Sequence, residues 1–140
     1  MKPECSQTDN DPEANSREFP MIAINKSKND VIIAEHIEWA GTGTGRRRGL
    51  LGRESLDCMG GVYLVPCEWI HTFGMRFPID VAFLSPAGRI LAVHHNLRSN
   101  RLSKIVLRAE GVLELSAGRL RATNTDVGDY VQFIEPNDVS

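Results

Sequence analysis

Short runs of apolar residues, separated by polar turns, recur along most of this chain. The first two runs, Met21 to Ile24 and Val31 to Ile37, are rich in β-branched side chains. Asparagine, lysine, serine and aspartate fill the positions between them, a composition that favours a turn. The pattern therefore predicts a β-hairpin at the start of the folded region.

A second hairpin is predicted further along the chain. Ile79 to Leu84 has the composition of a strand, and Arg89 to Leu97 has that of its return strand. The connecting Ser-Pro-Ala-Gly places proline at the second position and glycine at the fourth position of a tight turn. This hairpin is the strongest local structural signal in the sequence.

The remaining predicted elements are shorter. Strands are predicted at Gly61 to Cys67, Ile105 to Arg108, Val112 to Leu115 and Tyr130 to Ile134. Pro66 indicates that the first of these strands either stops there or lies at a sheet edge. Short helices are predicted at Arg46 to Leu51 and Ala117 to Asn124. The fold class is therefore α+β and mostly β: a barrel-like antiparallel or mixed sheet with one or two short helices.

Both ends of the chain differ from its middle. Residues 1–19 have almost no apolar content, so we expect a flexible tail, because too little surface would be buried to offset the loss of chain entropy. Residues 136–140 form a short C-terminal tail. A single β-rich domain over residues 20–135 remains, and the length of 140 residues is enough for one core.

Composition and charge restrict the classes of function. The net charge is −2, and 41% of the residues are hydrophobic, so the chain has no general attraction for nucleic acids or anionic membranes. It contains no apolar run of membrane-spanning length, and the first twenty residues lack the apolar segment of a secretory signal. We expect a cytoplasmic protein with no membrane partner. A nucleic-acid partner is disfavoured, so the expected partner is a small molecule or a protein.

Several fragments, taken in order, resemble one protein family. They are RRRGLLGR at 46–53, GGVYLVP at 60–66, IHTFGMRFPIDVAFL at 70–84, GRIL at 88–91, VLELSAG at 112–118 and VGDYVQF at 127–133. Together they are similar to domain-of-unknown-function family 192 over about residues 20–135. The resemblance implies a compact, mostly β domain with a helix packed on its sheet. It implies no established biochemical activity.

The largely apolar stretch from Cys67 to Phe83 includes a histidine, an arginine and an aspartate, which are His71, Arg76 and Asp80. Charged groups are rarely buried unless they are paired or hydrogen-bonded. The three residues are therefore either a structural polar network or a functional site. The sequence leaves both interpretations open.

Asp80 is expected to face inward. Because side chains alternate along Ile79 to Leu84, Asp80 interrupts one apolar face of this strand while the odd-numbered residues form the other face. An ionised carboxylate there needs a partner. The candidates are Arg76, which is close in sequence, and Arg48 or Arg53 from elsewhere in the fold.

The main functional hypothesis is a binding module for a small anionic ligand or a protein partner. Its candidate ligand-binding residues are Arg48, His71, Thr72, Arg76 and Asp80. The arginines would donate charged hydrogen bonds to an anionic group, and His71 and Thr72 would orient it.

Two further hypotheses stay open. One is a hydrolytic or transfer enzyme in which Asp80 orients His71 as the base, with Cys67 or Thr72 as the nucleophile. No sequence context marks either nucleophile, so we lean against an enzyme. The other is an interaction or scaffold protein with an exposed apolar patch. No cofactor and no metal site are expected, because Cys67 and His71 would be ~13 Å apart in an extended segment.

Overall fold

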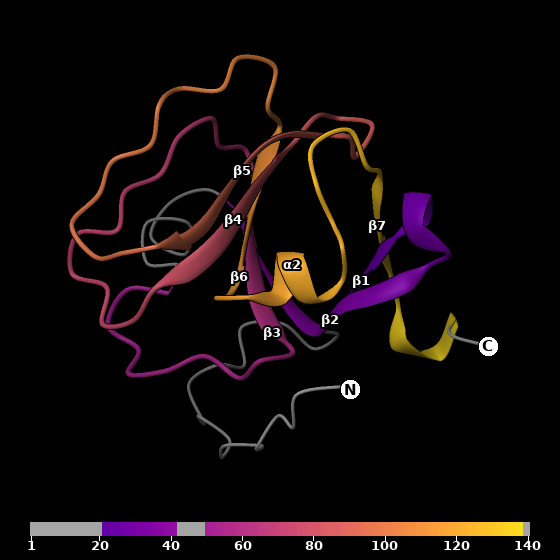
Figure 1. Ribbon diagram of the computed structural model, residues 1–140, viewed down its shortest axis with the longest axis horizontal. Coiled ribbons are helices and arrows are strands. Elements are labelled where there is room, and N and C mark those ends of the chain that lie inside the picture. Colours follow the sequence, from indigo (N-terminus) through magenta and orange to yellow (C-terminus); the bar gives the residue numbers. More distant parts are fainter. Residues whose placement is uncertain (1–20, 42–49, 139–140) are drawn as a thin grey trace.

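The computed structural model describes residues 21–41 and 50–138. In these ranges the chain forms a seven-stranded mixed sheet, curled into a half-barrel, with one short α-helix (Figure 1). The strands are β1 (Met21–Asn25), β2 (Val31–Ala40), β3 (Gly60–Leu64), β4 (Ile79–Leu84), β5 (Ile90–Leu97), β6 (Gly111–Ser116) and β7 (Val131–Ile134). The helix is α2 (Arg119–Ala122). The predicted fold class is confirmed.

The strand order in the sheet is β5-β4-β6-β3-β2-β1-β7. Every neighbouring pair is antiparallel except β2 and β3, which are parallel. Both predicted hairpins are confirmed, since β1 pairs with β2 and β4 pairs with β5. In the second hairpin the Gly88 amide donates to the Ser85 carbonyl at 2.8 Å and closes the predicted turn.

Some local predictions need correction. β3 stops before Pro66, which was one of the two predicted alternatives. The other alternative, an edge position, is wrong, because β3 pairs with β2 and β6 in the middle of the sheet. The segment Ile105 to Arg108, which was predicted to be a strand, is a loop. The Val106 amide donates a hydrogen bond to the Glu68 carbonyl in another loop instead of to a strand of the sheet. The predicted tail at 1–19 and most of the helix predicted at 46–51 lie outside the described residues.

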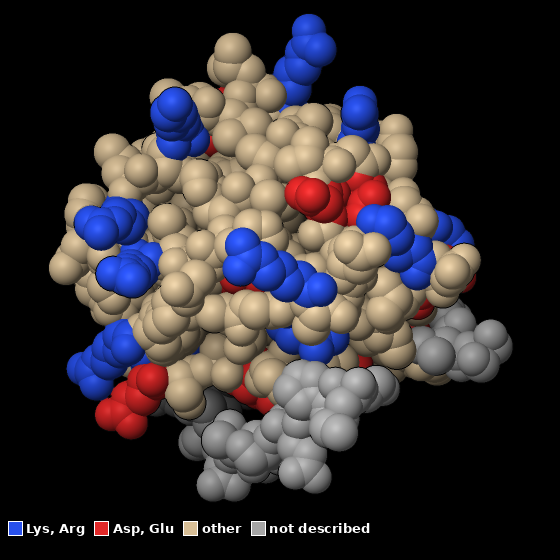
Figure 2. All heavy atoms as spheres, in the orientation of Figure 1, with Lys and Arg blue, Asp and Glu red and all other residues tan. Residues whose placement is uncertain are grey.

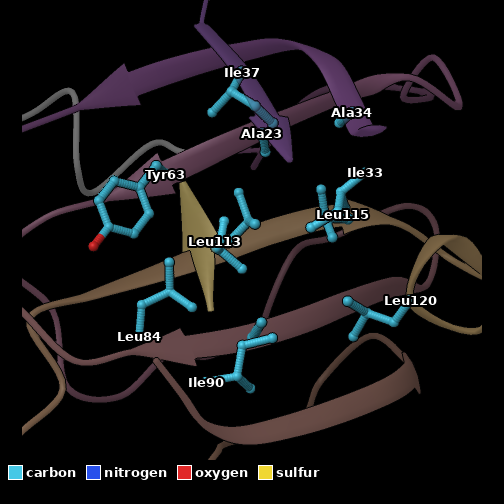
Figure 3. Close-up of a cluster of buried hydrophobic side chains, with 12 residues drawn as sticks. Ala23, Ile33, Ala34, Ile37, Tyr63, Leu84, Ile90, Leu113, Leu115 and Leu120 are labelled. Carbon is cyan, nitrogen blue, oxygen red and sulfur yellow. The ribbon is translucent and has the colours of Figure 1, made fainter. Parts of the chain in front are cut away.

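Apolar side chains from all seven strands fill the interior of the half-barrel (Figure 3). Leu120 of α2 is fully buried among them. Ala82 and Leu84 of β4 also belong to this interior cluster. Leu120 is the one buried side chain of this four-residue helix, and the Arg119 side chain also ties the helix to β2 by donating to the Ile32 and Ile33 carbonyls.

A second apolar cluster covers the outer face of the central strands. It combines Ile79, Val81 and Phe83 of β4 with side chains from β3 and β6 and from the loops around them. The two clusters divide the residues of β4 as the alternation argument predicts. Because both faces of β4 are covered, the whole strand is buried.

The two edge strands, β5 and β7, meet at one end of the sheet. The Ile90 amide donates to the Asp129 carbonyl, and the Val131 amide donates to the Gly88 carbonyl, both at 2.8 Å. Gly88 has a φ of +89°, and a Cβ placed on it would overlap the Val131 carbonyl oxygen. Glycine is therefore required where this end of the half-barrel closes.

Candidate functional site

The long connection from β3 to β4 carries most of the predicted site residues. Ile70 and Met75 of this connection are buried in the outer apolar cluster. The intervening backbone is thereby fixed against the sheet, and the side chains between these two anchors either turn inward or face solvent.

Thr72 is one of the inward-facing side chains. It is 1% exposed, and its hydroxyl donates to the Arg98 carbonyl at 2.6 Å while accepting from the Arg101 amide at 2.8 Å. Both partners lie in the loop between β5 and β6. The Thr72 hydroxyl therefore holds this second loop against the first one.

Asp80 is fully buried on the interior face of β4. One carboxylate oxygen accepts from the Asn96 amide at 2.9 Å, and the other accepts from the Gly118 and Leu120 amides at 3.0 Å each. Asn96 has a positive φ of 53° and lies where the register between β4 and β5 shifts. Backbone donors satisfy this carboxylate, which joins an irregular part of β5 to the start of α2.

The arginines named as partners of Asp80 lie elsewhere. Arg76 is exposed and forms an ion pair with Glu54 at 3.4 Å. Arg53 makes two hydrogen bonds to Glu38, at 3.0 and 3.1 Å. Arg48 lies outside the described residues. The expected pairing of Asp80 with Arg76 or Arg53 is therefore replaced by hydrogen bonds to backbone amides.

His71 lies at the surface of the first loop and is half-buried. Its Nδ1 accepts from the Phe73 amide at 3.3 Å, and its ring stacks on the Phe73 ring with centroids 5.2 Å apart. All side-chain hydrogen bonds of Asp80 within the described ranges come from backbone amides. The structure thus gives His71 and Asp80 separate partners.

The two loops run side by side and are joined by backbone hydrogen bonds. The Val106 amide donates to Glu68, the Ser103 amide to Ile70 and the Thr72 amide to Arg101, at 2.8, 2.9 and 2.8 Å. His71 and Leu102 also form an isolated antiparallel bridge. We call the solvent-facing side of residues 68–76 and 98–108 the two-loop surface. Figure 1 shows the loops projecting together beyond the ends of β4 and β5.

Large apolar side chains are exposed along the two-loop surface. Trp69 and Phe73 are 47% and 51% exposed, and they alternate along the chain with the buried Ile70 and Thr72. The second loop contributes Leu102 and Ile105, each 63% exposed, and Leu107, 75% exposed. Across the described ranges the other exposed large hydrophobic residues are Val127 and Tyr130, in the turn before β7.

The same surface is positively charged. Its basic residues are Arg76, Arg98, Arg101, Lys104 and Arg108, and all of them are exposed. Glu68 is the single acidic residue in the two segments, which therefore carry a formal charge of +4 in a chain of net charge −2. In Figure 2 lysine and arginine side chains line the left margin, where Figure 1 places the two loops.

Comparison with known proteins identifies the family. The model of DUF192, described as an uncharacterized ACR, matches residues 23–133. The chain belongs to domain-of-unknown-function family 192. The search of curated proteins found no match to this family member.

Two solved structures are similar to this family 192 domain. A protein of unknown function from Novosphingobium aromaticivorans has a TM-score of 0.72 and 16% identity, covering 91% of this chain and 99% of that one. A putative transcription regulator from Sinorhizobium meliloti has a TM-score of 0.67 and 20% identity, covering 85% of this chain and 98% of that one. At these identities the likeness supports a shared fold.

This family 192 domain also contains a buried carboxyl group that the sequence analysis did not single out. Glu114 of β6 is 6% exposed and lies beside Val62 of β3 and Val81 of β4. Burial raises its pKa to about 7, although the charge of Arg53 acts in the opposite direction. Glu114 therefore changes its protonation near neutral pH from within the outer apolar cluster.

Residues 21–41 and 50–138 contain no group of three His, Cys, Asp or Glu side chains arranged to hold a metal ion. In the same ranges no helix is both long and apolar enough to cross a membrane.

Proposed function

We propose that this family 192 domain is a binding module for a protein partner and that the two-loop surface is its contact site. The carrying observation is the gathering of Trp69, Phe73, Leu102, Ile105 and Leu107 on two hydrogen-bonded loops. Contiguous exposed apolar side chains are typical of interaction sites in soluble proteins. Aromatic and arginine side chains are also enriched where proteins bind one another.

The geometry favours a broad contact surface rather than a pocket for a small anionic ligand. Thr72 and Asp80, two of the candidate ligand contacts, are buried and already hydrogen-bonded to backbone groups. His71 and Arg76 are accessible and belong to the two-loop surface. In this proposal they contact the partner, while Thr72 and Asp80 keep the loops and the sheet in place.

Rigid anchoring of the loops supports the same proposal. The inward-facing Ile70, Thr72 and Met75 fix the first loop, and Ser103 hydrogen-bonds to Ile70 from the second one. A preformed surface loses less conformational entropy on binding than a flexible one does. The exposed side chains are therefore presented on a backbone that is already ordered.

The test begins with a photo-crosslinking amino acid placed at Leu107 of the full chain in cells. The captured protein is then purified, and its affinity for wild-type and variant domains is measured by calorimetry. We expect Leu107→Ser to weaken binding at least tenfold. The matched control is Val127→Ser, an exposed apolar residue in the turn before β7, which should bind like wild type.

Two results would contradict the proposal. One is the absence of a specific cross-link at Leu107, and the other is a purified partner that binds Leu107→Ser as tightly as wild type. Because one structural neighbour is described as a putative transcription regulator, duplex DNA is titrated in parallel. DNA binding that depends on Leu107 while no protein is captured would also count against a protein partner.

A further inference from the structure

We infer that the two-loop surface takes an acidic, extended peptide segment with apolar side chains at alternate positions. This inference rests on the proposed function and names the chemistry of the partner segment. Three observations carry it: the spacing of the rings on the first loop, the sign of the surrounding charge, and the mixture of aliphatic with aromatic side chains.

The three rings of the first loop follow the repeat of an extended chain. The centroids of Trp69 and His71 are 6.2 Å apart, and those of His71 and Phe73 are 5.2 Å apart. Alternate side chains of an extended peptide repeat about every 6.6 Å. Apolar side chains at every second position of a bound segment can therefore pack along this row and against Leu102, which lies opposite His71.

The charges around the rings favour an acidic segment. Arg101 and Lys104 flank the exposed Leu102 in the sequence, and Lys104 and Arg108 flank the apolar run between them. A partner whose remaining positions carry aspartate or glutamate would place carboxylates toward these cations. Complementary charge of this kind raises the association rate and excludes basic partners.

The side-chain types disfavour nucleic acid and membrane as the occupant. Single-stranded nucleic acids bind by stacking bases on free aromatic faces, whereas His71 and Phe73 already stack on each other at 25°. Leu102, Ile105 and Leu107 offer no ring for a base. Insertion into lipid would draw Lys104, between the exposed Leu102 and Ile105, toward hydrocarbon, where a charge is costly.

The experiment selects binders of the full chain from a random 12-residue peptide library displayed on phage. We expect enriched sequences rich in aspartate and glutamate, with apolar residues at every second position. A synthetic peptide of the consensus is then titrated by fluorescence anisotropy. Leu107→Ser and Arg101→Glu should each weaken its binding at least tenfold, whereas Arg121→Glu, an exposed cation on α2, should leave binding unchanged.

Several outcomes would overturn the inference. They are enrichment of basic or non-periodic sequences, no enrichment, or equal binding of a peptide with the same composition in shuffled order. Tighter binding of an oligothymidylate or of phosphatidylserine vesicles than of the consensus peptide would also overturn it. If these results occur while the partner captured at Leu107 still depends on that residue, the peptide chemistry is wrong and the proposed protein-binding function stands.

Discussion

At the scale of single residues, Glu114 links the fold to pH. An ordinary glutamate has a pKa of 4.5, and burial raises the pKa of Glu114 to about 7 in the folded protein. The folded state therefore holds this proton more tightly than the unfolded chain does. The contribution of Glu114 to the free energy of unfolding is fully present below pH 4.5, falls as the pH rises to about 7, and is lost above it.

The predicted change is about 3 kcal/mol between pH 4 and pH 8. Glu114→Gln keeps the shape of the side chain but has no proton to lose, so the difference in stability between wild type and variant should change by about this amount. Urea denaturation at intervals across this range measures it. Glu68→Gln, which changes an exposed carboxylate, serves as the control. Parallel pH profiles for wild type and Glu114→Gln would contradict the prediction.

The burial of Asp80 was predictable from the sequence, whereas its partners were not. Alternation along β4 placed its side chain on an apolar face, and the structure confirms that it is buried. Its hydrogen-bond donors are backbone amides of Asn96, Gly118 and Leu120, which no pattern of side chains reveals. Glu114 was missed because alternation opposite Leu113 and Leu115 usually indicates a solvent-facing position, and here loops cover that face too.

At the scale of elements, the carboxylate of Asp80 connects three parts of the fold. β4 supplies the side chain, β5 supplies the Asn96 amide and the start of α2 supplies two more amides. A carboxylate can accept from all of them at once, whereas an asparagine amide replaces one acceptor oxygen with a donor. A substitution of Asp80 that changes binding would therefore reflect a change in the fold as well as the loss of any ligand contact.

We predict that Asp80→Asn lowers the free energy of unfolding by about 2–4 kcal/mol, because at least one buried amide is left facing another donor. Urea denaturation gives the total effect, and hydrogen exchange of the Asn96, Gly118 and Leu120 amides locates it. Asp30→Asn, in an exposed ion pair with Lys26, should change stability by less than about 1 kcal/mol. Unchanged stability together with unchanged exchange of the three amides would argue against this role of Asp80.

The elements that could be predicted are those made by neighbours in sequence. Both hairpins follow from alternation and from their turn residues, and both are present. The central position of β3 depends on pairing with β2 and with the distant β6, which local composition does not encode. Ile105 to Arg108 has the composition of a strand but pairs with no strand of the sheet: Ile105 and Leu107 face solvent on the two-loop surface, and Val106 packs against the outer apolar cluster.

At the scale of the whole molecule, closure of the half-barrel rests on a close approach between β5 and β7. Bringing the two edge strands together closes a long loop of chain, which costs chain entropy. The contacts between these strands therefore affect the stability of the whole domain. The backbone of Gly88 lies against Val131 at this point, with hydrogen bonds on either side. A side chain there would require the two edge strands to separate.

We predict that Gly88→Ala destabilises the domain by about 3 kcal/mol or more, since its new methyl group meets the Val131 carbonyl in addition to straining the backbone. Gly128→Ala is the matched control: Gly128 has a φ of +95° but open space around its Cα, so backbone strain alone should cost about 1–2 kcal/mol. Thermal and urea denaturation compare the two variants, and faster hydrogen exchange at Ile90 and Val131 should accompany Gly88→Ala. Equal losses of stability in both variants would mean that the close approach of β5 and β7 adds nothing beyond the conformational preference of glycine.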